Sequence, residues 1–294
     1  MTKTWAAYPI VAALVAAEQM EGMGTDRQWQ PANDTQQHFL EHHFALCRDE
    51  VAGIPEIESL ASWSYETINV FLRKRGLTLQ LHPFGYPGFG VASVLDLFVR
   101  WEQQGEACIV RGVDSHDYPA VRIDRKGVEF YQVGHKHPIA ALKTTSGDWV
   151  YLTMHDDEPT HQFDIDHQAE AFSQRLGHPT TEYNGVIFPM VDLDQNVDIG
   201  WLLKLSTRAE NGDHVEVEQA LQQNILKINE VGARAKSAVA MELLPTAAMM
   251  HPEPDLVINA PFLLWFERSG FSTPLFAGYI TQEHWRNPGH LEER

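Results

Sequence analysis

The sequence predicts an α+β fold, with helices concentrated in the first part of the chain and antiparallel strands in the rest. Two early segments, 9–23 and 36–51, favour helices. From residue 121 onward, short apolar segments alternate with turn sequences, as in antiparallel sheets. The chain ends in two nearly continuous apolar segments, 262–266 and 275–280, which are typical of adjacent, fully buried strands. Together these patterns indicate helices packed on antiparallel sheets.

The first predicted helix lies in an apolar run from Trp5 to Ala17 that allows two interpretations. Lys3 before the run and the small residues at its end give the outline of a secretory signal. Pro9 lies inside the run, however, and proline suits the first turn of a helix, where its missing N–H needs no partner. A buried helix is therefore favoured, and a cytoplasmic location over secretion. The run is also too short to cross a membrane.

The second predicted helix, 36–51, is preceded by Asn33, Asp34 and Thr35, which are good N-cap residues. The segment 68–81 is strand-like at its ends and basic in the middle.

The middle of the chain is predicted mainly from turn signals. Residues 83–90 contain three glycines, two prolines and three aromatic residues, so they indicate a packed loop. The apolar run 91–101 suits either a buried strand or a helix, because periodicity alone does not separate the two. The remaining predictions are strands at 121–123, 128–133, 139–142 and 149–154, a helix at 168–176, a strand at 185–193, a helical turn at 198–205 and strands again from 215.

Length and charge limit the function classes. The 294 residues, 44% of them hydrophobic, can bury a sizeable core as one domain or two modest ones. The formal net charge of −18 opposes binding to nucleic acid and to anionic lipid, because both require clustered lysine and arginine. We therefore expect neither a nucleic-acid partner nor a membrane partner.

Histidines and carboxylates offer the main candidates for a metal site. His38 and His42 lie four residues apart on a predicted helix and can share a metal on one face, but no third ligand follows at motif spacing. His135 and His137 would share one side of a strand, or lie in a turn before Pro138. The acidic runs 156–158, 164–167 and 192–194 lack the glycine and terminal glutamate of a calcium loop. We therefore predict no metal and no cofactor.

Nucleophile and nucleotide-binding motifs are absent from the sequence. It contains no Gly-x-Ser-x-Gly, no Gly-x-Gly-x-x-Gly and no phosphate-binding loop. Its two cysteines, Cys47 and Cys108, lie among apolar neighbours, which favours buried free thiols over a single bridge. These observations do not predict an enzyme.

The segment that starts at Ala233 has an alternating pattern. Its odd positions to 241 are uncharged, whereas Arg234, Lys236 and Glu242 share the other face. As a strand, it could enter a sheet without burying a charge, which would cost several kcal/mol or more. The same residues are good helix formers, and the local pattern alone favours a helix.

The end of the chain resembles the C-terminal signature of the serpins. Residues 229–240 read Asn-Glu-Val-Gly-Ala-Arg-Ala-Lys-Ser-Ala-Val-Ala, similar to the Glu-x-Gly hinge of that family and its run of small residues. The later Pro-Phe-Leu-Leu-Trp-Phe and Pro-Leu-Phe-Ala-Gly resemble its closing strands. Trp101 resembles the tryptophan that ends a strand of the main sheet, in the region where that sheet opens.

The resemblance implies a divergent, shortened serpin-like protein, with one domain over 1–294 and an exposed reactive-centre loop at about 230–254. It implies a protease inhibitor rather than an enzyme: a protease attacks the loop, and the cleaved loop inserts into the main sheet before the acyl-enzyme is hydrolysed. A charge at Ala233 is expected to block insertion while leaving the resting fold intact. The implied hinge residues are Glu230, Gly232, Ala233 and Ala235.

Two alternatives remain open at this point. One is a non-inhibitory binding or structural protein with the same fold, and the other is a metal-dependent enzyme that uses His38, His42 and the acidic loops.

The resemblance also limits the position of the reactive bond to 244–251. Counting the family's usual number of loop residues forward from Glu230 and counting back from Pro254 give different reactive bonds. The two counts disagree because the loop is longer than is typical of the family. Small or unbranched apolar residues there suit elastase-, chymotrypsin- or subtilisin-like proteases. A trypsin-like target is not expected, since cleavage at Lys236 would cut the inserting segment too early. The candidates are Thr246, Ala247, Met249 and Met250.

Overall fold

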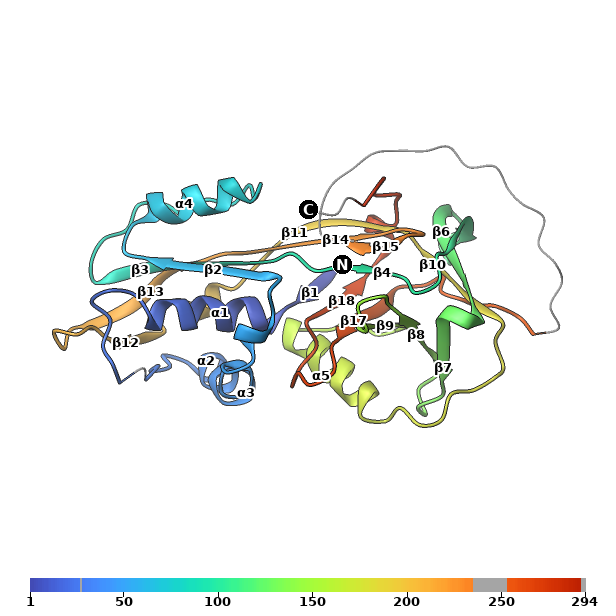
Figure 1. Cartoon of the computed structure of the whole chain (residues 1–294), viewed down its shortest axis with the longest axis horizontal. Coiled ribbons are helices and arrows are strands. Elements are labelled where there is room, and N and C mark those ends of the chain that lie inside the picture. Colours follow the sequence, from blue (N-terminus) through green and yellow to red (C-terminus); the bar gives the residue numbers. More distant parts are fainter. Residues whose placement is uncertain (27, 235–252, 292–294) are drawn as a thin grey trace. The chain divides into compact units, whose positions relative to one another are not determined.

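The computed structural model describes residues 1–26, 28–234 and 253–291 (Figure 1). The chain divides into two compact units, each built from segments that are far apart in the sequence. Unit 1 contains Met1–Trp5, Leu97–Asp194 and Ile225–Arg294, and unit 2 contains Ala6–Asp96 and Gln195–Asn224. Helices are present together with sheets in which most neighbouring strands are antiparallel, so the predicted α+β class is confirmed.

Unit 1 contains a six-stranded sheet in which all neighbours are antiparallel. The predicted closing strands form its β17 and β18, which are adjacent and almost entirely buried, so that prediction is confirmed. Tyr151 and Trp265 stack in the core of this sheet with their ring centroids 5.0 Å apart. In sheet order the strands are β1 (Lys3–Trp5), β18 (Phe276–Ile280), β17 (Phe262–Glu267), β9 (Trp149–Met154), β8 (Ile139–Lys143) and β7 (Val128–Tyr131).

Helix α5 (Gln162–Ser173) covers this sheet and buries Ile165, Ala169 and Phe172. The helix starts six residues before the predicted 168–176, because a capping box fixes its first turn. In that box the Asp164 carboxylate accepts the His161 N–H at 2.7 Å.

A second sheet of unit 1 has the order β16-β10-β6-β5. The predicted strand 185–193 is in fact two strands, β10 and β11 (Val191–Val197), which belong to different sheets. Pro189 ends β10, and its missing N–H is consistent with a break in the ladder. The other bounds are β16 (Leu256–Val257), β10 (Gly185–Pro189), β6 (Asp117–Asp124) and β5 (Glu106–Arg111).

Unit 2 begins with the buried helix α1 (Ala7–Glu18), in which Pro9 is the third residue. The second helical region comprises α2 (Asp34–Phe39), a π-helical turn (Leu40–Phe44) and α3 (Ala45–Cys47). The Asn33 side chain accepts the Gln36 N–H at 2.9 Å, so the predicted cap is confirmed. None of the helices in the described residues combines the length and hydrophobicity that crossing a bilayer requires.

The segment 68–81, which is strand-like at its ends, contains no strand in the structure, because helix α4 (Tyr65–Lys74) includes its first half. The Ser64 side chain caps this helix by accepting the Thr67 N–H at 3.3 Å. Ile68, Phe71 and Leu72 then lie at helical spacing on one buried face. The cap and this spacing outweigh the strand-like composition of the segment.

The sheet of unit 2 has the order β12-β13-β3-β2, and α1 packs on β2 and β3. Strands β13 and β3 pair in parallel, whereas the other two pairs are antiparallel. The ambiguous run 91–101 lies mostly in strands β3 and β4 (Phe98–Arg100) rather than in a helix. The bounds are β12 (Ser206–Arg208), β13 (His214–Ala220), β3 (Gly88–Leu95) and β2 (Ile57–Ser62).

Candidate functional site

The segment that contains the predicted hinge enters a four-stranded sheet as a strand. The order of this sheet is β11-β14-β15-β4, with β14 at Gln222–Ile228 and β15 at Gly232–Arg234 (Figure 1). Ala233 pairs with Ile228 on one side and with Val99 on the other, in both cases antiparallel. The chain therefore reverses after β14 and returns between β14 and β4.

A two-residue turn, centred on Glu230 and Val231, makes this reversal. The Asn229 N–H donates to the Gly232 carbonyl oxygen at 3.0 Å, which closes the hairpin. The Asn229 side chain accepts the Val231 N–H at 2.9 Å and donates to the Gly289 carbonyl oxygen at 2.8 Å. One asparagine thus holds the turn and ties it to the C-terminal segment, consistent with the preference of asparagine for turns.

Trp101 holds the turn from the end of β4. Its indole N–H donates to the Asn229 carbonyl oxygen at 2.9 Å, and its backbone N–H donates to the Val231 carbonyl oxygen at 3.1 Å. The side chain is buried and meets Phe188 edge to face, with ring centroids 6.1 Å apart. The tryptophan singled out in the sequence therefore contacts the predicted hinge segment directly.

Gly232 and Ala233 are constrained by close packing. A Cβ on Gly232 would lie 2.1 Å from the Val99 carbonyl oxygen and 3.0 Å from the Arg100 Cα, so only glycine fits there without moving the backbone. Ala233 is fully buried, at 0% exposure. The expectation that Ala233→Arg leaves the resting fold intact is therefore wrong, because position 233 is already inside the sheet.

The two strands that flank β15, β14 and β4, are adjacent in sequence to β13 and β3, and these two strands pair directly with each other. Leu221 alone separates β13 from β14, and Asp96 and Leu97 separate β3 from β4. Within unit 2, β13 and β3 pair in parallel from Glu216 opposite Gly88 onward. A strand antiparallel to both could lie between them only if this pair separated.

The remaining predicted loop residues lie outside the described part of the chain. This applies to Ala235 and to the reactive-bond candidates Thr246, Ala247, Met249 and Met250. Their roles stay predictions.

The histidine candidates do not form a cation site in the described part of the chain. No group of three or more histidine, cysteine or acidic residues there is arranged to hold a metal. The His38 and His42 rings pack together, with their centroids 4.3 Å apart. His135 and His137 lie in the turn between β7 and β8, with their centroids 5.7 Å apart.

Both cysteines are free, as the sequence favoured; Cys47 is buried and Cys108 is half-buried. Burial raises the pKa of the Cys108 thiol to about 11, so this thiol is a poor nucleophile at neutral pH.

Asn229 is the important site residue that the sequence reasoning missed. An asparagine directly before Glu-x-Gly was an available turn signal, since its side chain readily accepts the N–H two residues on. Its bond to Gly289 joins residues 60 positions apart, and no local pattern indicates such a bond.

Comparison with known proteins finds the fold through structure alone. No family model and no curated protein matches this chain. A serpin of the insect Tenebrio molitor, Serpin48, matches with a TM-score of 0.58 and 11% identity over 96% of this chain and 92% of its own. Thyroxine-binding globulin in complex with thyroxine matches with a TM-score of 0.58 and 12% identity. This match covers 98% of this chain and 93% of the globulin. A serpin from Schistosoma mansoni matches with a TM-score of 0.58 and 11% identity over 95% of each chain. The chain therefore has the serpin fold.

Proposed function

We propose that this protein inhibits a protease by inserting its cleaved loop into the sheet. The observation that supports the proposal is the position of β15, which lies between β14 and β4 and is antiparallel to both. Cleavage within 244–251 would release the chain that follows β15 from its C-terminal attachment. This chain would then extend β15 along the two flanking strands.

Because Ala233 is buried in β15, it determines which face of the chain that follows β15 would point into the protein after insertion. Side chains alternate along a strand, so Ala235, Ser237 and Val239 would share the face of Ala233. None of these residues is charged, and Lys236 would lie on the opposite face. The alternating pattern in the sequence therefore agrees with the register that β15 begins.

Insertion would also be favourable for the sheet. It would replace the parallel pairing of β13 and β3 by two antiparallel ladders, which are slightly more stable per residue. Each additional backbone hydrogen bond contributes about 1 kcal/mol net. This gain would drive the conformational change after the protease has formed its acyl-enzyme, and before water releases it.

The test is incubation of the full-length protein with an elastase, chymotrypsin, subtilisin and trypsin, followed by denaturing gels and mass spectrometry. We expect a complex that survives denaturant with at least one of the first three proteases, with cleavage inside 244–251. Trypsin should cut after Lys236 without forming a complex. A stable trypsin complex cut after Lys236 would overturn the proposed target class, and cleavage by all four proteases without any complex would overturn inhibition.

The hinge variant Ala233→Arg should abolish the complex. A guanidinium at this fully buried position would expel β15 from the sheet, since an unpaired buried charge costs several kcal/mol. Ala233→Ser is the matched control and should retain the complex. Ala235→Arg is a second probe, because it changes a residue that follows β15 and not a residue of the strand itself. Complex formation by both arginine variants would contradict insertion.

A binding protein with the same fold is the second candidate, because thyroxine-binding globulin in complex with thyroxine is among the similar structures. This candidate predicts loop cleavage without a trapped protease.

A further inference from the structure

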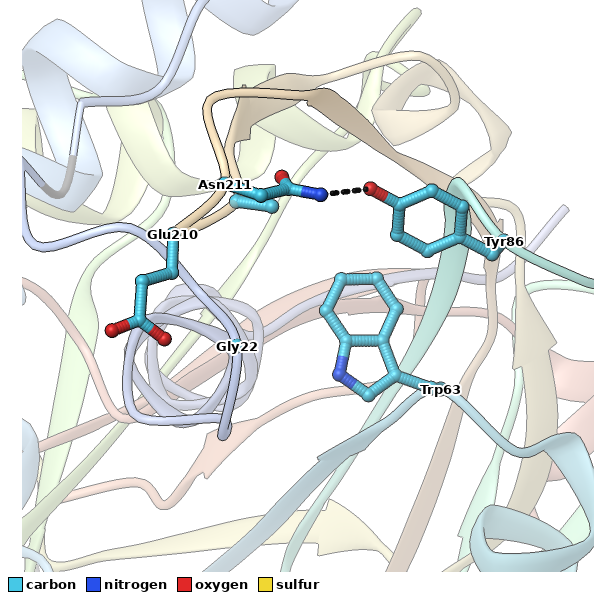
Figure 2. A pocket seen from close by; sticks show the side chains of 6 residues that line it. Gly22, Trp63, Tyr86, Glu210 and Asn211 are labelled. Carbon is cyan, nitrogen blue, oxygen red and sulfur yellow. Dashed lines mark hydrogen bonds between the residues drawn. The ribbon is translucent and has the colours of Figure 1, made fainter.

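Unit 2 contains an open pocket that is not part of the hinge site. Its volume of about 500 Å³ is within the range of small-ligand sites. Figure 2 shows two aromatic side chains on one side of Gly22 and a glutamate on the other. The lining residues are Gly22, Trp63, Tyr86, Ala209, Glu210 and Asn211.

The aromatic walls are held in place before any ligand arrives. The Trp63 indole N–H donates to the Glu21 carbonyl oxygen at 3.0 Å. The same indole packs edge to face on the fully buried Phe89, with ring centroids 5.7 Å apart. Tyr86 lies with its ring centroid 5.9 Å from that of Trp63, so the two rings form a fixed corner. A preorganised wall of this kind reduces the entropy lost on binding.

The side-chain donors that line the pocket are already used. The Tyr86 hydroxyl donates to the Asp213 carboxylate. The Asn211 amide donates to the Tyr86 hydroxyl at 3.3 Å and to the Asp213 carboxylate at 2.9 Å. Because the Trp63 N–H is also engaged, these side chains leave no donor for a sugar or an anion. What they still offer a ligand is aromatic surface.

Glu210 adds an uncompensated negative charge. Its carboxylate is exposed and has no hydrogen-bond or ion-pair partner among residues 1–26, 28–234 and 253–291. Its backbone N–H donates to the Gly22 carbonyl oxygen at 2.8 Å, which fixes this residue beside the pocket. A Cβ on Gly22 would meet no atom within 4 Å, so the pocket is open beside Gly22.

We propose that this pocket binds a small organic cation of the quaternary ammonium class, over the faces of Trp63 and Tyr86 and with Glu210 as counter-ion. Aromatic faces attract cations, and indole does so most strongly. A quaternary ammonium needs neither a donor nor an acceptor, which suits a pocket whose polar side chains are mostly paired with one another. The net charge of −18 adds a general attraction for cations.

The test compares choline with its neutral isostere, 3,3-dimethylbutan-1-ol, by ligand-observed NMR on the full-length protein at constant ionic strength. Choline should bind, and the alcohol should bind at least about tenfold more weakly, since it has the same shape without the charge. Glu210→Gln should raise the Kd for choline about threefold to tenfold and leave that for the alcohol unchanged. Glu218→Gln removes a nearby exposed carboxylate outside the pocket and should have no effect.

A second pair of variants tests the aromatic wall without disturbing the core. Tyr86 is 59% exposed, so Tyr86→Leu should fold, and it should weaken choline binding by about threefold or more. Tyr86→Phe restores the ring without the hydroxyl and should bind choline better than Tyr86→Leu. Equal affinity for choline and the alcohol would overturn the proposal, and so would choline binding that neither Glu210→Gln nor Tyr86→Leu changes.

Discussion

At the scale of single residues, His155 is a buried titratable side chain of unit 1 whose polar atoms are not satisfied. It follows β9, is buried, and both of its ring nitrogens lack a hydrogen-bond partner among the described residues. The His135 ring is 5.6 Å away between centroids, and Tyr279 meets His155 edge to face at 6.4 Å. A protonated imidazole would therefore be poorly accommodated.

Burial lowers the pKa of His155, and so do His135 and His137, whereas Asp156 and Asp157 act in the opposite direction. The neutral form therefore predominates in the fold at neutral pH.

The stability of the protein should depend on pH through His155. A folded pKa below the ordinary value of about 6.5 means that the unfolded chain binds the proton first. The contribution of the neutral ring is complete above about pH 6.5, and it is lost as the pH falls through the lowered folded pKa, at up to about 1.4 kcal/mol per pH unit. Chemical unfolding between pH 7.5 and 5 would measure this decline.

His155→Gln should make that decline shallower, because glutamine does not titrate. The exposed His116 lies outside this cluster, and His116→Gln is the matched control for the histidine-to-glutamine change. An equal slope in the wild-type protein and in His155→Gln would exclude His155 as the source.

At the scale of elements, the sequence predicted several of those that local signals determine. The Asn33 cap and the continuous apolar strands β17 and β18 were read correctly, since each depends on neighbouring residues. Helix α4 was missed because the Ser64 cap and the helical spacing after it were given too little weight.

The hinge and the pocket show which parts of a site the sequence leaves undetermined. The residues from Ala233 onward fit a helix as well as a strand, and the strand partner Val99 lies more than a hundred positions away. The resemblance pointed to Glu230, Gly232 and Trp101, but it gave no indication that β15 already lies in the sheet. The pocket likewise joins Trp63 to a hairpin beyond residue 200, and no local motif indicates this contact.

At the scale of the whole molecule, the similar structures establish the fold but leave the function open between inhibition and binding. The two functions differ in the fate of the loop after a protease has cut it. Inhibition requires the cleaved chain to enter the sheet, whereas ligand binding does not require it. The thermal stability of the cleaved protein therefore tests whether the step that inhibition needs takes place.

We expect cleavage within 244–251 to raise the thermal unfolding midpoint. A net gain of about 5 kcal/mol, from roughly five additional backbone hydrogen bonds, corresponds to a rise of about 8 °C at the usual unfolding entropy per residue for a chain of 294 residues. Limited digestion with subtilisin and then differential scanning calorimetry would measure it. Cleaved Ala233→Arg should show little or no rise, because its β15 would not stay in the sheet. An unchanged midpoint in the cleaved wild-type protein would favour the binding protein, since the loop would then be cut without entering between β13 and β3.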